Sequence, residues 1–217
     1  MALAIFDLDE TLIDGDCASL WSAYMAKLGW VNAESFLKRD HELMALYSQG
    51  LLAMEDYMAF SLSPLVGRSA EEVAHVVEPF VEEVIEPLIY SDACQCLAQH
   101  RSAGDRLLVI SASGVHLVAP IAQRLGISEV LAIELEQQHG CYSGNTSGIL
   151  TYRDGKVKRL QAWLTEQAES LDGAHFYSDS RNDLPLLSLV TQPRVVNPDA
   201  ALKAHAEQAG WPILSWR

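Results

Sequence analysis

Short apolar runs alternate with longer segments of helical periodicity along most of the chain. Each run ends in a polar turn, and apolar residues three and four positions apart follow it, which is typical of a strand followed by an amphipathic helix. The runs predicted to be strands are 3–8 (LAIFDL), 106–112 (RLLVISA), 175–179 (HFYSD) and 194–196 (RVV). Strands that alternate with helices form a parallel sheet covered on both faces. The pattern therefore predicts an α/β fold.

The segment between the first two strands is far longer than one helical crossover. Residues 16–88 carry helical periodicity almost throughout, and glycine or proline stands at the expected helix ends. The positions concerned are Gly29, Gly50, Gly67 and Pro87. We predict a small all-helical domain, 16–88, inserted into a sheet domain formed by 1–15 and 89–217.

Two further segments depart from this alternation. Residues 130–150 (VLAIELEQQHGCYSGNTSGIL) alternate apolar and polar side chains around a Gly/Asn/Ser turn, which predicts an inserted antiparallel hairpin. The closing segment EQAGWPILSW is predicted to add a last strand, with Pro212 near its start. Both segments would belong to the sheet domain.

Composition and charge exclude several classes of protein. The 217 residues are 49% hydrophobic and 20% charged, which is typical of a folded globular core. Because the net charge is −14 and the 15 Lys and Arg residues do not cluster, we expect no nucleic-acid partner. The sequence shows no signal peptide and no apolar run of membrane-spanning length, so we expect a cytoplasmic protein without a membrane anchor. Its cysteines are expected to be free thiols: Cys17, Cys94, Cys96 and Cys141.

Polar side chains that could carry chemistry follow the predicted strands. The carboxyl ends of parallel strands share one edge of a sheet, where open α/β sheets bind their ligands. The side chains predicted at that edge, on strand ends or on the adjoining helices, are Asp7, Asp9, Ser111, Lys156, Asp179 and Asp183.

Three carboxylates at one edge repel each other unless a cation lies between them. Asp7, Asp9 and Asp179 offer only oxygen ligands, the kind that Mg²⁺ prefers when water completes the set. The ion and Lys156 would supply positive charge for a phosphate group and keep Asp7 ionised as a nucleophile. Ser111 would donate a hydrogen bond to a phosphoryl oxygen. The residues thus predict a magnesium site for phosphate chemistry.

The motifs DLDETL, VISAS, DGKVKRL and YSDSRNDLPLL, in this order, resemble those of the haloacid dehalogenase (HAD) superfamily. Over nearly its whole length the chain is similar to the phosphoserine-phosphatase-like branch (subfamily IB), in which a helical cap follows the first motif. The resemblance implies a Rossmann-like parallel sheet with an inserted all-helical cap. It also implies a magnesium-dependent phosphomonoesterase that acts on a small-molecule phosphate ester.

The resemblance further implies how the reaction would run. Asp7 would attack phosphorus and form an aspartyl-phosphate. Asp9 would protonate the leaving oxygen and later activate water. Ser111 and Lys156 would bind the transferring phosphoryl group.

The implied ligands of Mg²⁺ are Asp7, the backbone carbonyl of Asp9, and Asp179. Asp183 and Asn182 would support these ligands from behind.

Either Lys156 or Lys158 could be the lysine that binds phosphate. Lys156 is preferred because Leu160 and Trp163, four and seven residues later, would form the buried face of the helix behind it. Lys158 is expected to be solvated.

Specificity in this branch depends on the cap. Its phosphoserine phosphatases carry a Glu where this sequence has Asp16, and a cap Arg that binds the substrate carboxylate. Ser61 falls at about that second position, and Arg68 is the nearest Arg after it. Without the bidentate Arg contact, phosphoserine is disfavoured as a substrate.

The residues expected near the mouth of the site are acidic or aromatic: Asp14, Asp16, Trp21, Tyr24, Tyr57 and Phe60. Such a lining suits a leaving group that carries an ammonium or imidazolium and no carboxylate. Histidinol phosphate fits this description and is the favoured substrate. The aromatic residues are equally consistent with the packed core of the cap. His116, just after SASG, is expected to face the phosphate.

Other functions stay open at this point. A phosphatase of a lysophospholipid or of phosphatidylglycerol phosphate is the second hypothesis, although a membrane anchor or a basic amphipathic surface would then be expected. A phosphoserine phosphatase, a phosphotransferase and a non-catalytic phosphate-binding regulator rank lower. The regulator ranks low because every catalytic position holds a competent residue.

Overall fold

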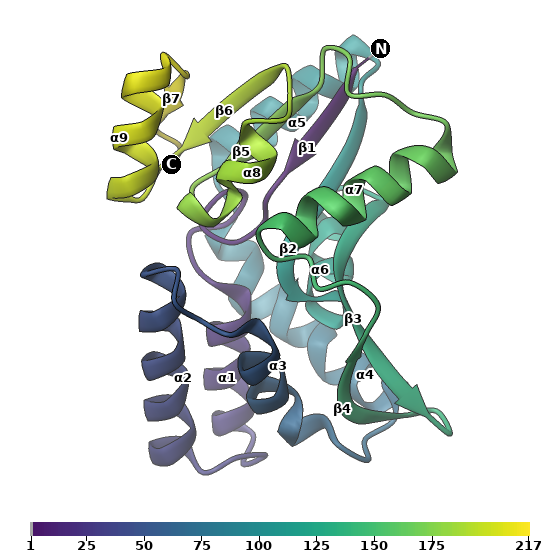
Figure 1. The fold of residues 1–217 in the computed structure, drawn as a ribbon. Coiled ribbons are helices and arrows are strands. Elements are labelled where there is room, and N and C mark those ends of the chain that lie inside the picture. Colours follow the sequence, from purple (N-terminus) through teal and green to yellow (C-terminus); the bar gives the residue numbers. More distant parts are fainter. Residues whose placement is uncertain (1) are drawn as a thin grey trace.

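The computed structural model describes residues 2–217 and contains a seven-stranded sheet (Figure 1). Its strands lie in the order β4-β3-β2-β1-β5-β6-β7, and all neighbouring pairs are parallel except β3 and β4. The strands are β1 (Leu3–Phe6), β2 (Arg106–Gly114), β3 (Glu129–Gln138), β4 (Cys141–Ser147), β5 (His175–Ser178), β6 (Gln192–Val196) and β7 (Ile213–Leu214). The predicted α/β fold is confirmed.

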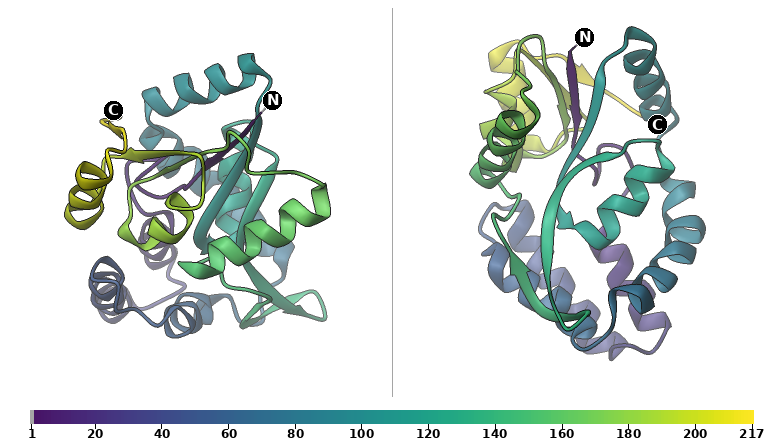
Figure 2. Two further views of the ribbon diagram at one scale, coloured as in Figure 1. Left: turned by 45° about the horizontal axis from the view of Figure 1, so that its top comes forward. Right: turned by 90° about the vertical axis from the view of Figure 1, so that its right-hand side faces the viewer.

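Helices cover both faces of the sheet because apolar side chains alternate between the faces along its central strands. Leu3 and Ile5 of β1 belong to one buried cluster, whereas Ala4 and Phe6 belong to the other. The first cluster includes side chains of α7, α8 and α9, and the second includes side chains of α5 and α6. Figure 2 shows α5 and α7 on opposite sides of the sheet. These helices are α5 (Ser91–Ala103), α6 (Val115–Arg124), α7 (Asp154–Gln167), α8 (Leu184–Leu187) and α9 (Ala200–Ala209), with the short η4 (Arg181–Asp183) before α8.

The segment from α1 to η3, residues 17–88, is helical and lies beyond the carboxyl end of β1 (Figure 1). Side chains cap three of its helices: Asp16, Asn32 and Ser69 each accept a hydrogen bond from a backbone N–H of the first turn. Its elements are α1 (Cys17–Lys27), α2 (Ala33–Ser48), α3 (Met54–Leu62), η1 (Ser63–Leu65), α4 (Ala70–Phe80), η2 (Val81–Ile85) and η3 (Glu86–Leu88). The predicted helices are confirmed. Within residues 2–217 no helix combines the length and the apolar composition needed to cross a bilayer.

The helical segment shares its core with one face of the sheet. Where the chain enters and leaves the segment, the backbone N–H of Asp14 donates to the carbonyl of Leu88 at 2.8 Å. Inside the segment, Trp21 belongs to the same buried cluster as Phe6 of β1. The division into a cap domain and a sheet domain therefore stays a prediction.

Strand β3 belongs to two pairings. Its first half pairs in parallel with β2, and its second half forms an antiparallel hairpin with β4. The hairpin predicted over 130–150 is confirmed, but its first strand is part of the main sheet and not an insertion. The physical reason is that 131–133 (LAI) is buried on both faces, as in a central strand. The predicted last strand is also confirmed, since Ile213 of β7 pairs with Val195 of β6.

Candidate active site

Asp7 directly follows β1 at the carboxyl edge of the sheet. Its backbone N–H donates to the carbonyl of Tyr177 on β5 at 2.9 Å, and its side chain is buried. Oδ1 of Asp7 accepts a hydrogen bond from the backbone N–H of Leu8 at 2.9 Å and lies 3.0 Å from Nζ of Lys156. No hydrogen bond from residues 2–217 reaches Oδ2, so this oxygen is available for reaction in the cavity that Asp7 lines.

Lys156 lies in the first turn of α7, buried between two carboxylates. Its Nζ is 3.0 Å from Oδ1 of Asp7 and donates to Oδ2 of Asp183 at 2.8 Å. Burial opposes a charge here, but Asp183 and Asp7 outweigh it and raise the pKa of Lys156 above its ordinary value. The same oxygen of Asp183 accepts a hydrogen bond from the hydroxyl of Ser178 at 2.7 Å. Asp183 therefore holds Lys156 in place beside Asp7.

The structure distinguishes the two candidate lysines. Lys156 is 1% exposed, whereas Lys158 is exposed to solvent. Leu160 and Trp163 form the buried face of α7, as the helical spacing predicts. Of the two, Lys156 is the lysine at the carboxyl edge of the sheet.

Asp179 directly follows β5 and lines the same cavity as Asp7. Its Oδ1 accepts a hydrogen bond from the hydroxyl of Thr11 at 3.2 Å. Burial raises the pKa of Asp179 well above its ordinary value, and the charges of Asp7 and Asp183 add to this. Burial also raises the pKa of Asp7, despite the opposing effect of Lys156. Negative charge at this edge is therefore incompletely balanced by the protein itself.

This donor set fits Mg²⁺. The ion binds through one or two carboxylates and several waters more readily than in an all-protein cage, and it would balance the charges of Asp7 and Asp179. The backbone carbonyl of Asp9 would be a third oxygen ligand. No group of three Asp, Glu, His or Cys side chains that could hold an ion occurs within residues 2–217. Asp7, Asp9 and Asp179 nevertheless line one cavity, so the predicted convergence of three carboxylates is seen, with the Asp9 side chain held by hydrogen bonds to α1 and β2.

The carboxylate of Asp9 is turned toward α1 and β2. Its Oδ1 accepts a hydrogen bond from the backbone N–H of Cys17 at 2.7 Å. Its Oδ2 accepts from the hydroxyls of Ser113 at 2.8 Å and Ser111 at 3.3 Å. Ser111 is thus at the site as predicted, and Ser113 is a site residue that the prediction omits. The signal was present in VISAS, because side chains two apart on a strand share a face.

Asn182 has a different role from the predicted one. Its Nδ2 donates to the backbone carbonyl of Tyr47 at 3.3 Å, and its Oδ1 accepts from Nε of Arg153 at 3.2 Å. Arg153 also donates to the carbonyl of Gly50. Gly50 has φ +70°, and a Cβ there would lie 2.5 Å from the guanidinium. Asn182 and Arg153 therefore fasten the end of α2 to the sheet, and do not support the metal ligands.

A cavity of about 210 Å³ lies between the carboxyl edge of the sheet and α2. Helix α2 contributes Met44, Tyr47 and Ser48 to its lining, and no Lys or Arg among residues 2–217 lines it. Its acidic lining residues are Asp7, Asp9, Glu10, Asp16, Asp179 and Asp199. An acidic cavity of this kind attracts a cation, whether an ion or a charged group of a ligand.

Asp16 is the predicted cap residue that the structure places in this cavity. As the N-cap of α1 it accepts a hydrogen bond from the backbone N–H of Ser19 at 2.7 Å. Burial, with a smaller effect from Asp9, raises the pKa of Asp16 to about 8. A cationic group beside Asp16 would favour its ionised form.

Replacing Asp16 with asparagine is expected to stabilise the metal-free fold near neutral pH. Asparagine keeps the N-cap acceptor. The pKa of Asp16 is about 8 in the folded protein, against an ordinary value of 3.8. Between these values only the unfolded chain releases the proton, so the folded state becomes less stable as the pH rises. The melting temperature of D16N should exceed that of the wild type at about pH 8 and match it near about pH 4. A constant difference across this range would contradict the raised pKa.

Three of the aromatic residues predicted at the mouth of the site make packing contacts inside the helical segment. Trp21 is buried against Phe80, with ring centroids 5.1 Å apart. The Tyr24 ring packs against both of these rings, and its centre lies 5.7 Å from Nζ of Lys27. Tyr24 is not among the residues that line the site cavity. Phe60 stacks on the ring of Phe36 at 4.3 Å. The placement of Tyr24 and Phe60 at the mouth is therefore wrong, because their helix faces meet neighbouring helices.

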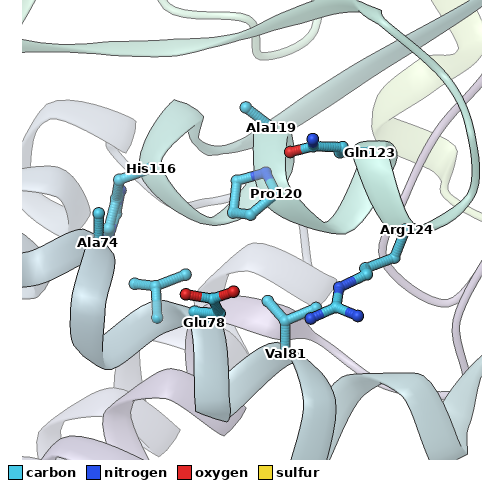
Figure 3. Close-up of a pocket in the computed structure, with 9 residues that line it drawn as sticks. Ala74, Glu78, Val81, His116, Ala119, Pro120, Gln123 and Arg124 are labelled. Carbon is cyan, nitrogen blue, oxygen red and sulfur yellow. The ribbon is translucent and has the colours of Figure 1, made fainter.

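His116 does not face Asp7. Its ring forms one wall of a separate cavity of about 420 Å³ between α4 and α6, with Glu78 and Arg124 along the same cavity (Figure 3). That cavity contains none of the carboxylates at the strand ends. The expectation that His116 faces the phosphate is wrong, because α6 turns its first residues toward the helical segment.

Known proteins are similar to this chain in sequence and in fold. Residues 4–188 match the family model described as haloacid dehalogenase-like hydrolase. The chain belongs to this family. It is 39% identical over 219 residues to a histidinol-phosphatase of Neisseria meningitidis serogroup C, covering 99% of each chain. It is 31% identical over 225 residues to the phosphoserine phosphatase SerB1 of Mycobacterium tuberculosis, covering 100% of this chain and 71% of that protein. As a HAD hydrolase with phosphatase relatives, the protein is a phosphoric monoester hydrolase.

Solved structures of this HAD fold agree with the architecture. A Bordetella pertussis protein of unknown function has a TM-score of 0.91 and 34% identity, covering 98% of this chain and 97% of that chain. A phosphoserine phosphatase solved as a phospho-aspartyl intermediate analogue has a TM-score of 0.72 and 17% identity, covering 98% and 92%. At that identity the second likeness shows the fold alone. Magnesium and an aspartyl-phosphate are typical of the family.

Proposed function

We propose that this HAD hydrolase is a magnesium-dependent phosphomonoesterase that forms an aspartyl-phosphate on Asp7, and that its substrate is histidinol phosphate. The observation that carries the chemistry is the buried array of Asp7, Lys156 and Asp183, in which one oxygen of Asp7 is held and the other is free. A carboxylate fixed at one oxygen is positioned for attack through the other.

Each residue around Asp7 has its own role in the reaction. Lys156 neutralises charge on the phosphoryl group, and the Ser111 hydroxyl donates a hydrogen bond to one of its oxygens. Oδ2 of Asp7 forms a bond to phosphorus as the bond to the leaving oxygen breaks. Asp9, between Asp7 and α1, gives its proton to that oxygen and later takes a proton from the water that attacks the aspartyl-phosphate. Asp7 is thereby regenerated and inorganic phosphate is released.

Asp7, Asp179 and the carbonyl of Asp9 would hold Mg²⁺, which when bound supplies positive charge to the phosphoryl oxygens. Thr11 orients Asp179 through its hydroxyl. Asp183 does not reach the ion in this scheme and acts through Lys156.

The acidic cavity supports a cationic leaving group. Its lining contains no Lys or Arg to bind a carboxylate, and Arg68 lies elsewhere, 3.8 Å from the ring centre of Trp30 and paired with Glu72. A phosphoserine substrate is therefore disfavoured, although relatives such as SerB1 carry that name. A cavity of about 210 Å³ is also too small to enclose a lipid chain. The 39% identity to a histidinol-phosphatase points the same way.

The proposal predicts a clear ranking of substrates. Phosphate release should be fastest from histidinol phosphate. The kcat/KM should be at least about tenfold lower for phosphoserine, whose carboxylate finds no Lys or Arg in the cavity, and for a lysophosphatidate, which has no ammonium to meet the acidic lining. EDTA should abolish release and added Mg²⁺ restore it. Asp179→Asn should raise the Mg²⁺ concentration needed for half-maximal rate by at least about tenfold. Similar rates for all esters would contradict the substrate, and release that ignores EDTA would contradict the metal.

A further inference from the structure

Two small voids continue from the site cavity into the space between α1, α3 and the end of β2. The nearer void, of about 20 Å³, shares Asp9 and Asp16 with the site cavity. The farther void, of about 10 Å³, shares Tyr57 and Ser113 with the nearer one and extends to His116. Each has room for roughly one water molecule. The shared lining residues place the two voids in succession from Asp9 toward His116.

Three side chains that line the farther void carry buried polar atoms without partners. Trp21 and Tyr57 are 3% and 5% exposed, and neither the indole Nε1 nor the phenol oxygen has a hydrogen-bond partner among residues 2–217. Both ring nitrogens of His116 are buried and unpartnered in the same part of the chain. Unsatisfied buried polar atoms are rare because each is costly. Three such side chains around one void indicate a place where a bound molecule supplies the missing hydrogen bonds.

The ring of His116 is held over the backbone at Gly114, just before α6. A Cβ at Gly114 would lie 2.7 Å from Nδ1 and 2.8 Å from Cε1 of that ring, so only glycine permits the approach. Burial lowers the pKa of His116 to about 4, which leaves the imidazole neutral near neutral pH. A neutral imidazole offers one donor and one acceptor. His116 is therefore suited to an uncharged polar partner.

The chemistry of the two voids defines what can enter them. No Lys or Arg lines either void, so an anionic group would have no counter-charge there. At the near end, the carboxylate of Asp16 suits an ammonium. At the far end, Trp21 can only donate, so the ligand must offer an acceptor, while Tyr57 and His116 can donate or accept. The walls of the far end are aromatic, with the rings of Trp21 and His116 edge to face at 6.4 Å.

We propose that Trp21, Tyr57 and His116 bind the end of the leaving group farthest from phosphorus, and that this end is a neutral nitrogen heterocycle. This inference rests on the proposed function, because it places the leaving group beyond Asp9. The farther void is too small for such a ring in this conformation, so α1 and α3, which carry Trp21 and Tyr57, must move away from α6 as the ring enters. In histidinol phosphate the imidazole would occupy this place and the ammonium would lie beside Asp16.

Tyr57→Phe tests the inference by removing one hydroxyl and leaving the ring. With histidinol phosphate, KM should rise about tenfold while kcat stays within about twofold, because the lost hydrogen bond is remote from the reacting atoms. With ethanolamine phosphate, which has the ammonium but no ring, both constants should stay within about twofold of the wild type. Trp21→Phe removes only the indole N–H among the polar groups and should show the same split.

Tyr24→Phe is the matched control, since Tyr24 packs beside Trp21 and lines neither void. The melting temperatures of all three variants identify any that fails to fold. If Tyr57→Phe or Trp21→Phe does not fold, the other of the two tests the inference. The inference is overturned if the KM for histidinol phosphate rises no more in Tyr57→Phe and Trp21→Phe than in Tyr24→Phe. It is also overturned if the KM for ethanolamine phosphate rises by the same factor. In both cases hydrolysis by the wild type still supports the proposed function. If the wild type with Mg²⁺ hydrolyses neither ester, the proposed function itself fails.

Discussion

Asp7→Asn is expected to lower kcat for histidinol phosphate by at least about ten-thousandfold, because removal of a covalent nucleophile leaves only binding and electrostatic effects. The amide nitrogen and oxygen of asparagine occupy nearly the same space as the carboxylate, so the cavity keeps its shape. The measurement is steady-state phosphate release at saturating Mg²⁺ and substrate. A residual rate within about a hundredfold of the wild type would show that Asp7 is not the nucleophile.

The control for this variant is its folded state. Asp7 is one of two carboxylates that flank Lys156, and Asp183 remains as the partner of that ammonium in the variant. The fold should therefore survive, with a cooperative melting transition and retained binding of the substrate. A melting curve and a substrate-binding titration therefore accompany the rate assay. They separate loss of the nucleophile, which leaves folding and binding intact, from loss of the fold.

Lys156→Met is expected to destabilise the fold by about 3–5 kcal/mol and to remove most of the activity. Methionine fills a similar volume but leaves Asp7 and Asp183 facing each other without the ammonium that lies between them. At 1% exposure for Lys156, water cannot take its place readily. Chemical denaturation at about pH 7 measures the free energy of unfolding.

Lys158→Met supplies the matched comparison. It makes the same chemical change two residues away on the same helix, at an exposed position. Its free energy of unfolding should change by less than about 0.5 kcal/mol, and its kcat/KM should be unchanged. Equal effects of the two substitutions would contradict the assignment of Lys156 to the site.

Site residues that directly follow a strand could be predicted from the sequence. Asp7 and Asp179 each come after a buried apolar run, and a parallel sheet brings such positions to one edge. Lys156 could be chosen over Lys158 because helical periodicity puts it on the face of Leu160. For these residues the local pattern and the overall fold agree, so the sequence alone is sufficient to place them at the site.

Residues brought in by packing between distant segments could not be predicted. Thr11 meets Asp179, and Tyr47 enters the cavity, only because separate parts of the chain fold against each other. Helical periodicity puts Trp21 and Tyr24, three residues apart, on one helix face, but it does not show which element covers that face. The structure shows that the covering side chain is Phe80, so Tyr24 lies away from the site.

The prediction that the first part of β3 belongs to an insertion is wrong for a related reason. The apolar run 131–133 reads equally as one arm of a hairpin or as a buried strand of the main sheet, since both are extended. Pairing with β2 on one side and with β4 on the other satisfies both patterns at once. Only the three-dimensional arrangement decides between them.

The most direct test of the account is to trap the covalent intermediate. Wild-type protein with Mg²⁺ is mixed with phosphate ester labelled on phosphorus, quenched in acid within one turnover, and digested for peptide mapping. We expect label on the peptide that contains Asp7, released by hydroxylamine as an acyl phosphate is, and no label in Asp7→Asn. Phosphate release at the normal rate with no label on that peptide at any time point would contradict Asp7 as the nucleophile.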